Sequence, residues 1–180
     1  MKAKGFSLIE VLVAIIIVSI GLVGLMLLQA KSIKYTHEIT NRNTAVSLID
    51  EMFEILSADK ENIFEIYPPI KPFYDDIKTE TIYFDRNGKI RFTESECPAF
   101  NQPLKGKAQA SCWLNRVYEQ LPGARELKNE IKICPSFKSG TCAGDDYTGS
   151  MVEITLVWQA TEKDTCGADN VCRYSARIEL

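Results

Sequence analysis

Apolar residues are concentrated near the start of the chain. The run from Val11 to Leu28 is interrupted only by Ser19, Gly21 and Gly24. At about 1.5 Å per residue, this run spans roughly 27 Å as a helix, close to the thickness of a bilayer core. The pattern therefore predicts a helix of membrane length near the N-terminus.

A helical pattern continues beyond this run. The first proline is Pro68, so no earlier residue interrupts a helix by lacking a backbone N–H. Apolar residues recur at helical spacing, with charged residues between them. These apolar positions are Ala45, Val46, Leu48, Ile49, Met52, Phe53, Ile55 and Leu56. We expect one helix from about Phe6 to Leu56, about 75 Å long, whose second half is a core element of a folded head.

The helical pattern ends before the segment from Ser57 to Thr79, whose prolines predict an irregular loop. The next segment, from Thr81 to Phe92, carries β-favouring residues on both sides of the pair Asn87-Gly88. An Asn-Gly pair supplies the positive φ angles of a tight turn. The segment therefore predicts a β-hairpin.

Short periodic segments separated by loops make up the rest of the head. They are a helix from Ser111 to Leu121 and strands from Glu130 to Cys134, from Met151 to Gln159 and from Cys172 to Leu180. The residues expected on one face of the middle strand are Val152, Ile154, Leu156 and Trp158. Together with the hairpin, the three strands predict an antiparallel sheet of four or five strands packed on the long helix. The fold class is α+β: a long N-terminal helix, membrane-embedded in its first half, packed against a small antiparallel head.

The overall composition is consistent with an anchor joined to one folded head. The chain has 180 residues, of which 46% are hydrophobic, and these are enriched in the first thirty positions. The formal net charge is −3. This value argues against a generally basic surface for nucleic acid, although it leaves a local basic patch possible.

All six cysteines lie in the second half of the chain, at Cys97, Cys112, Cys134, Cys142, Cys166 and Cys172. An even number of cysteines outside a membrane segment is typical of disulfides formed in an oxidising compartment. A zinc site is disfavoured because the chain has no Cys-x-x-Cys pair, and we expect no metal. Six cysteines allow fifteen pairings. Sequence order favours the local set Cys97–Cys112, Cys134–Cys142 and Cys166–Cys172.

The charges around the apolar run predict its orientation. Lys2 and Lys4 precede the run and should stay in the cytoplasm while the rest crosses the membrane. No Ala-x-Ala pattern follows the run, so we expect no cleavage there and a retained anchor. Glu10 has two interpretations: a glutamate reaching the headgroups near the helix start, or an intramembrane carboxylate with a specific partner.

The segment from Gly5 to Ala14 resembles the class III signal of type IV pilins and of the pseudopilins of type II secretion. In that family, a membrane peptidase cuts after the glycine and methylates the new amino terminus. The resemblance implies that Gly5 is the cleavage-site glycine, Phe6 the methylated first mature residue, and Glu10 the glutamate at the fifth mature position. It also implies a pilin-like version of the α+β fold.

The resemblance divides the chain into three parts. Residues 1–5 are the leader, residues 6–28 are the transmembrane and filament-core half of the helix, and residues 29–180 are the head, including the helix to about residue 56. The implied partners are major and minor pilins bound through the helix, the prepilin peptidase and methyltransferase, the inner-membrane assembly platform and a large tip adhesin. Before assembly the head is expected in the periplasm of a bacterium, and afterwards in the extracellular pilus.

The segments from Ile9 to Ala14 and from Ser19 to Leu25 resemble the PilV type of minor pilin. This implies a subunit near the pilus tip that promotes assembly and supports adhesion, twitching motility or DNA uptake. One alternative is a minor pseudopilin of type II secretion. Another is a pilin module that binds DNA or a surface, for which the candidate residues are Lys105, Lys107, Arg116, Arg125 and Lys128. Because glutamates alternate with these residues, a solvated face is favoured and no specific nucleic acid is expected.

No enzymatic motif is present in the sequence. The single histidine, His37, falls on the long helix, which argues against a catalytic triad in the head. The pair Asp145-Asp146 lies in a glycine-containing turn, where adjacent side chains diverge. Trp113 and Trp158 are interpreted as core residues. We therefore expect no catalytic residues and no cofactor.

Overall fold

The computed structural model describes residues 8–69, 76–95, 97, 104–144, 147–161 and 165–180. Its elements in chain order are α1 (Leu8–Ala58), the short 3₁₀ helix η1 (Lys60–Asn62), α2 (Lys107–Gln120), β1 (Lys132–Pro135), β2 (Met151–Gln159) and β3 (Val171–Glu179). The chain divides into two compact units, Met1–Ile39 and Thr40–Leu180. The division falls within the predicted long helix, which the structure confirms as one continuous α1.

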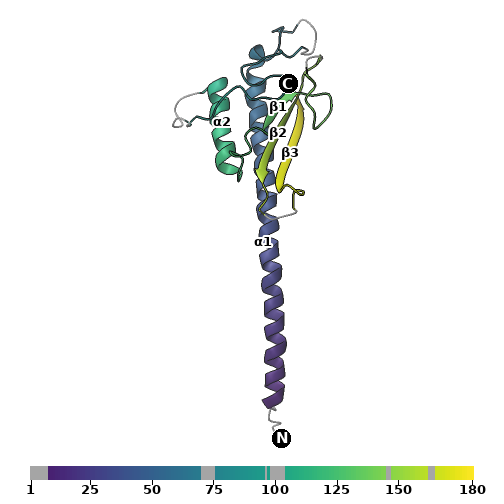
Figure 1. Ribbon diagram of the computed structural model, residues 1–180. Coiled ribbons are helices and arrows are strands. Elements are labelled where there is room, and N and C mark those ends of the chain that lie inside the picture. The colour runs from purple at the N-terminus through teal and green to yellow at the C-terminus, as the bar shows by residue number, and fades with distance from the viewer. Residues whose placement is uncertain (1–7, 70–75, 96, 98–103, 145–146, 162–164) are drawn as a thin grey trace. The chain divides into compact units, whose positions relative to one another are not determined.

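The second half of α1 is the central element of the head. Its buried residues recur at intervals of three and four, the spacing that aligns side chains along one face of a helix. They are Ala45, Leu48, Ile49, Met52, Ile55 and Leu56. Val46 and Phe53, predicted on the same apolar face, are half-buried at its edge. In Figure 1, α2 lies on one side of this part of α1 and the sheet on another, which confirms the α+β fold class.

The sheet is antiparallel, with β2 between β1 and β3. In β2, Val152, Ile154, Leu156 and Trp158 are buried on one face, as the alternating pattern predicts. The opposite face is also covered at Glu153, whose carboxylate accepts hydrogen bonds from the Ser136 hydroxyl (3.0 Å) and the Gly140 N–H (2.6 Å).

The prediction of four or five strands is wrong for the described residues, which form a sheet of three strands. Residues 80–92 contain isolated bridges instead, between Phe84 and Ile90 and between Glu80 and Asp85. The reason is local hydrogen bonding, because side-chain oxygens of Thr81 and Asp85 accept from nearby backbone N–H groups.

The turn of this segment also differs from the prediction. Of the Asn87-Gly88 pair, only Gly88 has a positive φ, of +93°. The Gly88 N–H donates to the Asp85 carbonyl (3.0 Å), which closes the turn over Arg86 and Asn87. The predicted position of the turn is therefore correct, but the flanking residues do not extend it into a strand ladder.

The helix α2 docks on α1 through a tryptophan. It begins at Lys107, four positions before the predicted start, and Trp113 is completely buried. The Trp113 indole N–H donates to the Leu48 carbonyl on α1 (2.7 Å). One turn further along each helix, Arg116 forms an ion pair with Glu51.

We predict that Trp113→Phe lowers the free energy of unfolding of the head by about 1–3 kcal/mol, because it removes the indole donor and part of the core volume. The measurement is calorimetric unfolding of the full chain in detergent micelles. Gln120→Ala, at the exposed end of the same helix, is the control and should change stability by less than about 0.5 kcal/mol. Equal stability of the two variants would contradict the docking role of Trp113.

Candidate functional site

The first half of α1 carries a single ionisable side chain. Between Leu8 and Ala30 this is Glu10, in the first turn, where the helix dipole favours a negative charge. The next cationic side chain along the helix is Lys31, roughly 30 Å away at 1.5 Å per residue. Among the residues that the structure describes, Glu10 has no salt-bridge partner. Gly5 and Phe6, the predicted cleavage and methylation residues, lie outside the described residues.

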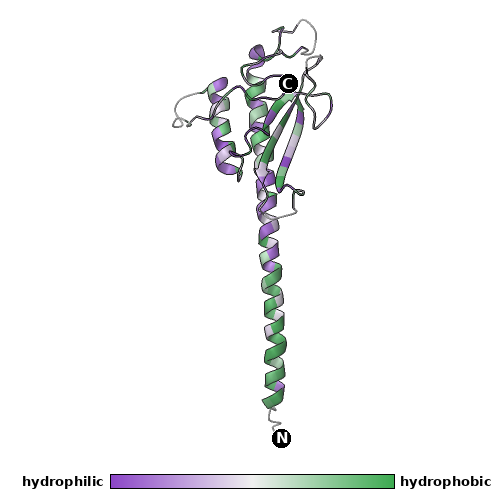
Figure 2. Ribbon diagram, viewed as in Figure 1, coloured by the Kyte–Doolittle hydropathy of each residue, from purple (hydrophilic) through white to green (hydrophobic). Residues whose placement is uncertain are grey.

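Apolar side chains surround Glu10 and cover the helix on all sides. From Leu8, which is 82% exposed, to Leu28, which is 67% exposed, no side chain in this half is buried within the chain. Figure 2 shows this part of α1 almost entirely in green, the colour of hydrophobic residues. In the described chain, α1 is the one helix long and apolar enough to cross a membrane, by length and composition. An apolar helix of this kind fits membrane anchoring.

Three small residues in this half have no structural partner outside the helix. The Ser19 hydroxyl donates to the Ile15 carbonyl (2.7 Å), so its hydrogen bond is satisfied within the helix. An added Cβ at Gly21 or Gly24 would meet no described atom within 4 Å. Packing within one chain therefore does not explain the glycines, whereas close approach of a second helix would.

Three disulfides close local loops of the head. The pairs are Cys97–Cys112, Cys134–Cys142 and Cys166–Cys172, the set that sequence order favours. The first joins α2 to the segment before it, the second joins β1 to the loop that follows, and the third joins the start of β3 to the preceding turn. Disulfides of this kind persist in oxidising compartments.

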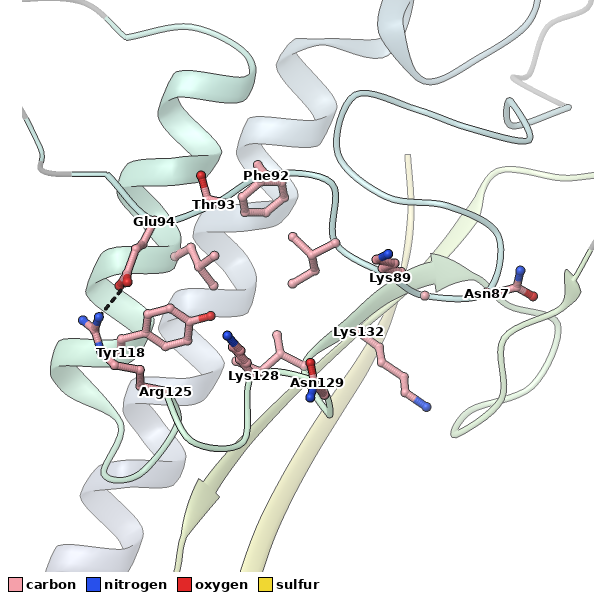
Figure 3. A pocket seen from close by; sticks show the side chains of 14 residues that line it. Asn87, Lys89, Phe92, Thr93, Glu94, Tyr118, Arg125, Lys128, Asn129 and Lys132 are labelled. Atoms are coloured by element: carbon pink, nitrogen blue, oxygen red, sulfur yellow. Dashed lines mark hydrogen bonds and ion pairs between the residues drawn. The ribbon is translucent and has the colours of Figure 1, made fainter.

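The head also contains an open groove of about 550 Å³ (Figure 3). Its walls are residues 87–90 and 92–94, the α2 side chains of Leu114 and Tyr118, and residues 125, 128, 129, 131 and 132 before and at the start of β1. Four cationic side chains line it: Lys89, Arg125, Lys128 and Lys132. The one carboxylate of the described lining, Glu94, bonds to Arg125 (2.6 Å). Among the residues that the structure describes, the lining contains neither histidine nor cysteine.

Tyr118 forms part of the floor of the groove. The Arg125 guanidinium lies 5.0 Å from the centre of its ring. Burial raises the pKa of the Tyr118 hydroxyl, the charge of Glu94 raises it further, and Arg125 opposes this. The hydroxyl therefore remains protonated at neutral pH and can donate a hydrogen bond.

The five basic residues that the sequence grouped as a candidate nucleic-acid site do not come together. Arg125 and Lys128 line the groove, but Arg116 pairs with Glu51 on α1. Lys107 lines a different depression. Sequence reasoning missed Lys89 and Lys132, because they reach the groove from a turn and a strand that are distant in the chain.

Comparison with protein families identifies one match. The prokaryotic N-terminal methylation motif matches residues 1–26, which include Gly5, Phe6 and Glu10. This motif indicates a protein similar to type IV pilins and pseudopilins. Comparisons with curated proteins and with solved structures find no match.

We predict that replacing both Cys97 and Cys112 by serine lowers the free energy of unfolding of the head by about 3 kcal/mol, as expected for a closed loop of about 15 residues. The measurement is thermal unfolding of the oxidised full chain in detergent micelles. The control is the unchanged chain after reduction, which opens all the disulfides and should lose more stability than the double variant. A double variant as stable as the oxidised parent would contradict a stabilising role for this disulfide.

Proposed function

We propose that this chain is a minor pilin subunit of a type IV pilus, which joins the filament through its N-terminal helix and promotes the initiation of assembly near the tip. The observation that carries the proposal is Glu10. It is a carboxylate without a described partner on an otherwise apolar, exposed helix, inside a segment that matches the methylation motif.

The proposed chemistry begins with cleavage after Gly5 by a prepilin peptidase. Hydrolysis of this peptide bond leaves a free amine on Phe6, which the same enzyme methylates and which remains positively charged. In the low dielectric of a membrane or a helix bundle, an ammonium and a carboxylate attract each other strongly. The Glu10 carboxylate of one subunit would therefore pair with the Phe6 amine of its neighbour and set the axial register.

The rest of the helix supports transfer from lipid to filament. Its apolar side chains are exposed all round, so they can pack against lipid or against neighbouring helices without rearrangement of the head. Gly21 and Gly24 leave open space into which another helix can pack closely. The partners in this proposal are other major and minor pilins, the inner-membrane assembly platform and a large tip adhesin.

The proposed location follows from charge and redox chemistry. Lys2 and Lys4 favour a cytoplasmic N-terminus, so the head lies in the periplasm before assembly and outside the cell afterwards. The three disulfides support an oxidising location. We propose that the head acts by binding other subunits and not as an enzyme.

A minor pseudopilin of type II secretion is the second candidate, because the same motif and the same helix serve both systems. The six cysteines of the head weigh toward the pilus. Deleting the gene separates the two: loss of surface pili and of twitching motility supports the pilin, whereas intact pili with loss of protein secretion supports the pseudopilin.

We predict that Glu10→Gln lowers the amount of this protein in sheared filaments by at least about tenfold, because an unpaired ammonium is then buried at the subunit contact. The variant should still be cleaved, methylated and inserted in the membrane. Quantitative immunoblots of sheared pili and of membranes give the two amounts.

Glu10→Asp is the matched control, since it keeps the charge and shortens the side chain by one methylene. It should be incorporated more efficiently than Glu10→Gln. Normal incorporation of the glutamine variant would exclude the proposed ion pair.

A further inference from the structure

The groove of the head is lined by residues 87–90 and 92–94, by Leu114 and Tyr118, and by residues 125, 128, 129, 131 and 132. Among these described residues, four are cationic and one is a carboxylate, so the lining has an excess of positive charge. Lys89, Lys128 and Lys132 are all exposed. None of these three has a salt bridge within the described part of the chain. In Figure 3 Lys128, Asn129 and Lys132 follow one wall of the groove, and Lys89 lies on the opposite wall.

Arginines engage three carboxylates from segments in or beside the groove. Arg91 pairs with Glu80, Arg125 with Glu94 and Arg173 with Glu130. Glu130 adjoins the groove in sequence, yet its carboxylate bonds to Arg173 on β3 (2.7 Å). The lysines therefore remain available for a negative charge from outside the chain.

The floor of the groove is apolar. Phe92, Leu114 and Ile131 are buried beneath it, and Ile90 and Tyr118 are half-buried. A ligand that fills the groove therefore gains from an apolar side chain as well as from negative charge. The polar groups at the rim, such as the amides of Asn87 and Asn129, can hydrogen-bond a peptide backbone.

The walls of the groove are held in place by the fold. Gly88 is buried with a φ of +93°, and an added Cβ there would lie 2.9 Å from the Sγ of Cys142. The Gly88 carbonyl accepts from the Ile133 N–H (3.4 Å), so the turn is fixed against β1. On the other side, Trp113 anchors α2 to α1. A preformed groove binds a ligand with a smaller loss of conformational entropy.

We propose that this groove docks an acidic peptide segment bearing a bulky apolar side chain, from the head of a neighbouring filament subunit. The inference rests on the proposed function, which places other subunits beside this head. A nucleic acid fits less well, because its backbone requires a longer track of cations and the Glu94 carboxylate stands at one end of the groove.

The test measures binding of a defined peptide to the full chain in detergent micelles. The probe is a fluorescein-labelled hexapeptide of alternating glutamate and phenylalanine, followed by fluorescence anisotropy. The comparison probes are the same peptide with glutamine in place of glutamate and a single-stranded oligothymidine. We expect binding of the glutamate peptide at least about tenfold tighter than of either comparison probe, and weaker binding at higher salt.

The decisive variant is Lys128→Glu with Lys132→Glu, and the matched control is Lys105→Glu with Lys138→Glu. Both pairs are exposed and change the net charge equally, but the control residues lie outside the groove. We expect the groove variant to weaken binding of the glutamate peptide at least about tenfold and the control variant to change it less than about threefold. Unfolding temperatures of both variants verify that the head is folded.

Three outcomes would overturn the proposal: equal binding of the glutamine peptide, tighter binding of the oligothymidine, or equal effects of the two variants. The result of the peptide-binding test is independent of the result of the filament test with Glu10→Gln. Glu10→Gln should leave peptide binding in micelles unchanged, because Glu10 lies outside the head. A failure of the groove proposal therefore leaves the filament test intact, and the reverse also holds.

Discussion

The exposed apolar surface of the first half of α1 is the constraint on which the rest of the molecule depends. Side chains such as Leu8 and Leu28 cannot remain in water, so this half needs lipid or other helices around it. The same helix becomes a core element from Ala45 onward, where one face is buried and the other is polar. A single continuous helix thus serves two environments, and the change in its residue pattern sets the boundary between them.

Directional polar contacts attach the head to this helix. The Trp113 indole binds the Leu48 carbonyl, and the Tyr83 hydroxyl donates to the Asp59 carboxylate just after the end of α1 (2.5 Å). Burial of the Tyr83 hydroxyl and the negative charge of Asp59 raise the pKa of Tyr83 well above its ordinary value, so this donor stays protonated. These directional bonds add to the close packing of the apolar core in selecting one arrangement.

The sequence pattern correctly predicted the elements that depend on residues close together in the chain. The periodicity of α1 and the alternation of β2 were sufficient, because each depends on residues close in sequence. The hairpin prediction failed because Thr81 and Asp85 satisfy the backbone locally, a competition that strand propensity does not capture. The groove was not predictable, since Lys89 and Lys132 meet only after β1 and the turn have packed together.

A difference between the arginines and the lysines of the groove connects the fold to its proposed partners. A planar guanidinium carries several donors in a fixed geometry and is weakly hydrated, so it suits contacts within the folded chain. Arg125 bonds to Glu94, and Arg173 bonds to both Glu130 and Asp169. An ammonium is more strongly hydrated and remains in solvent until a partner arrives. In the proposed function, the helix brings the subunit into a filament and the head selects the neighbour that it contacts there. Glu10 and the groove lie in separate units of the chain. Under the two proposals, substitutions in the groove would therefore change the choice of neighbour without changing the helix that enters the filament.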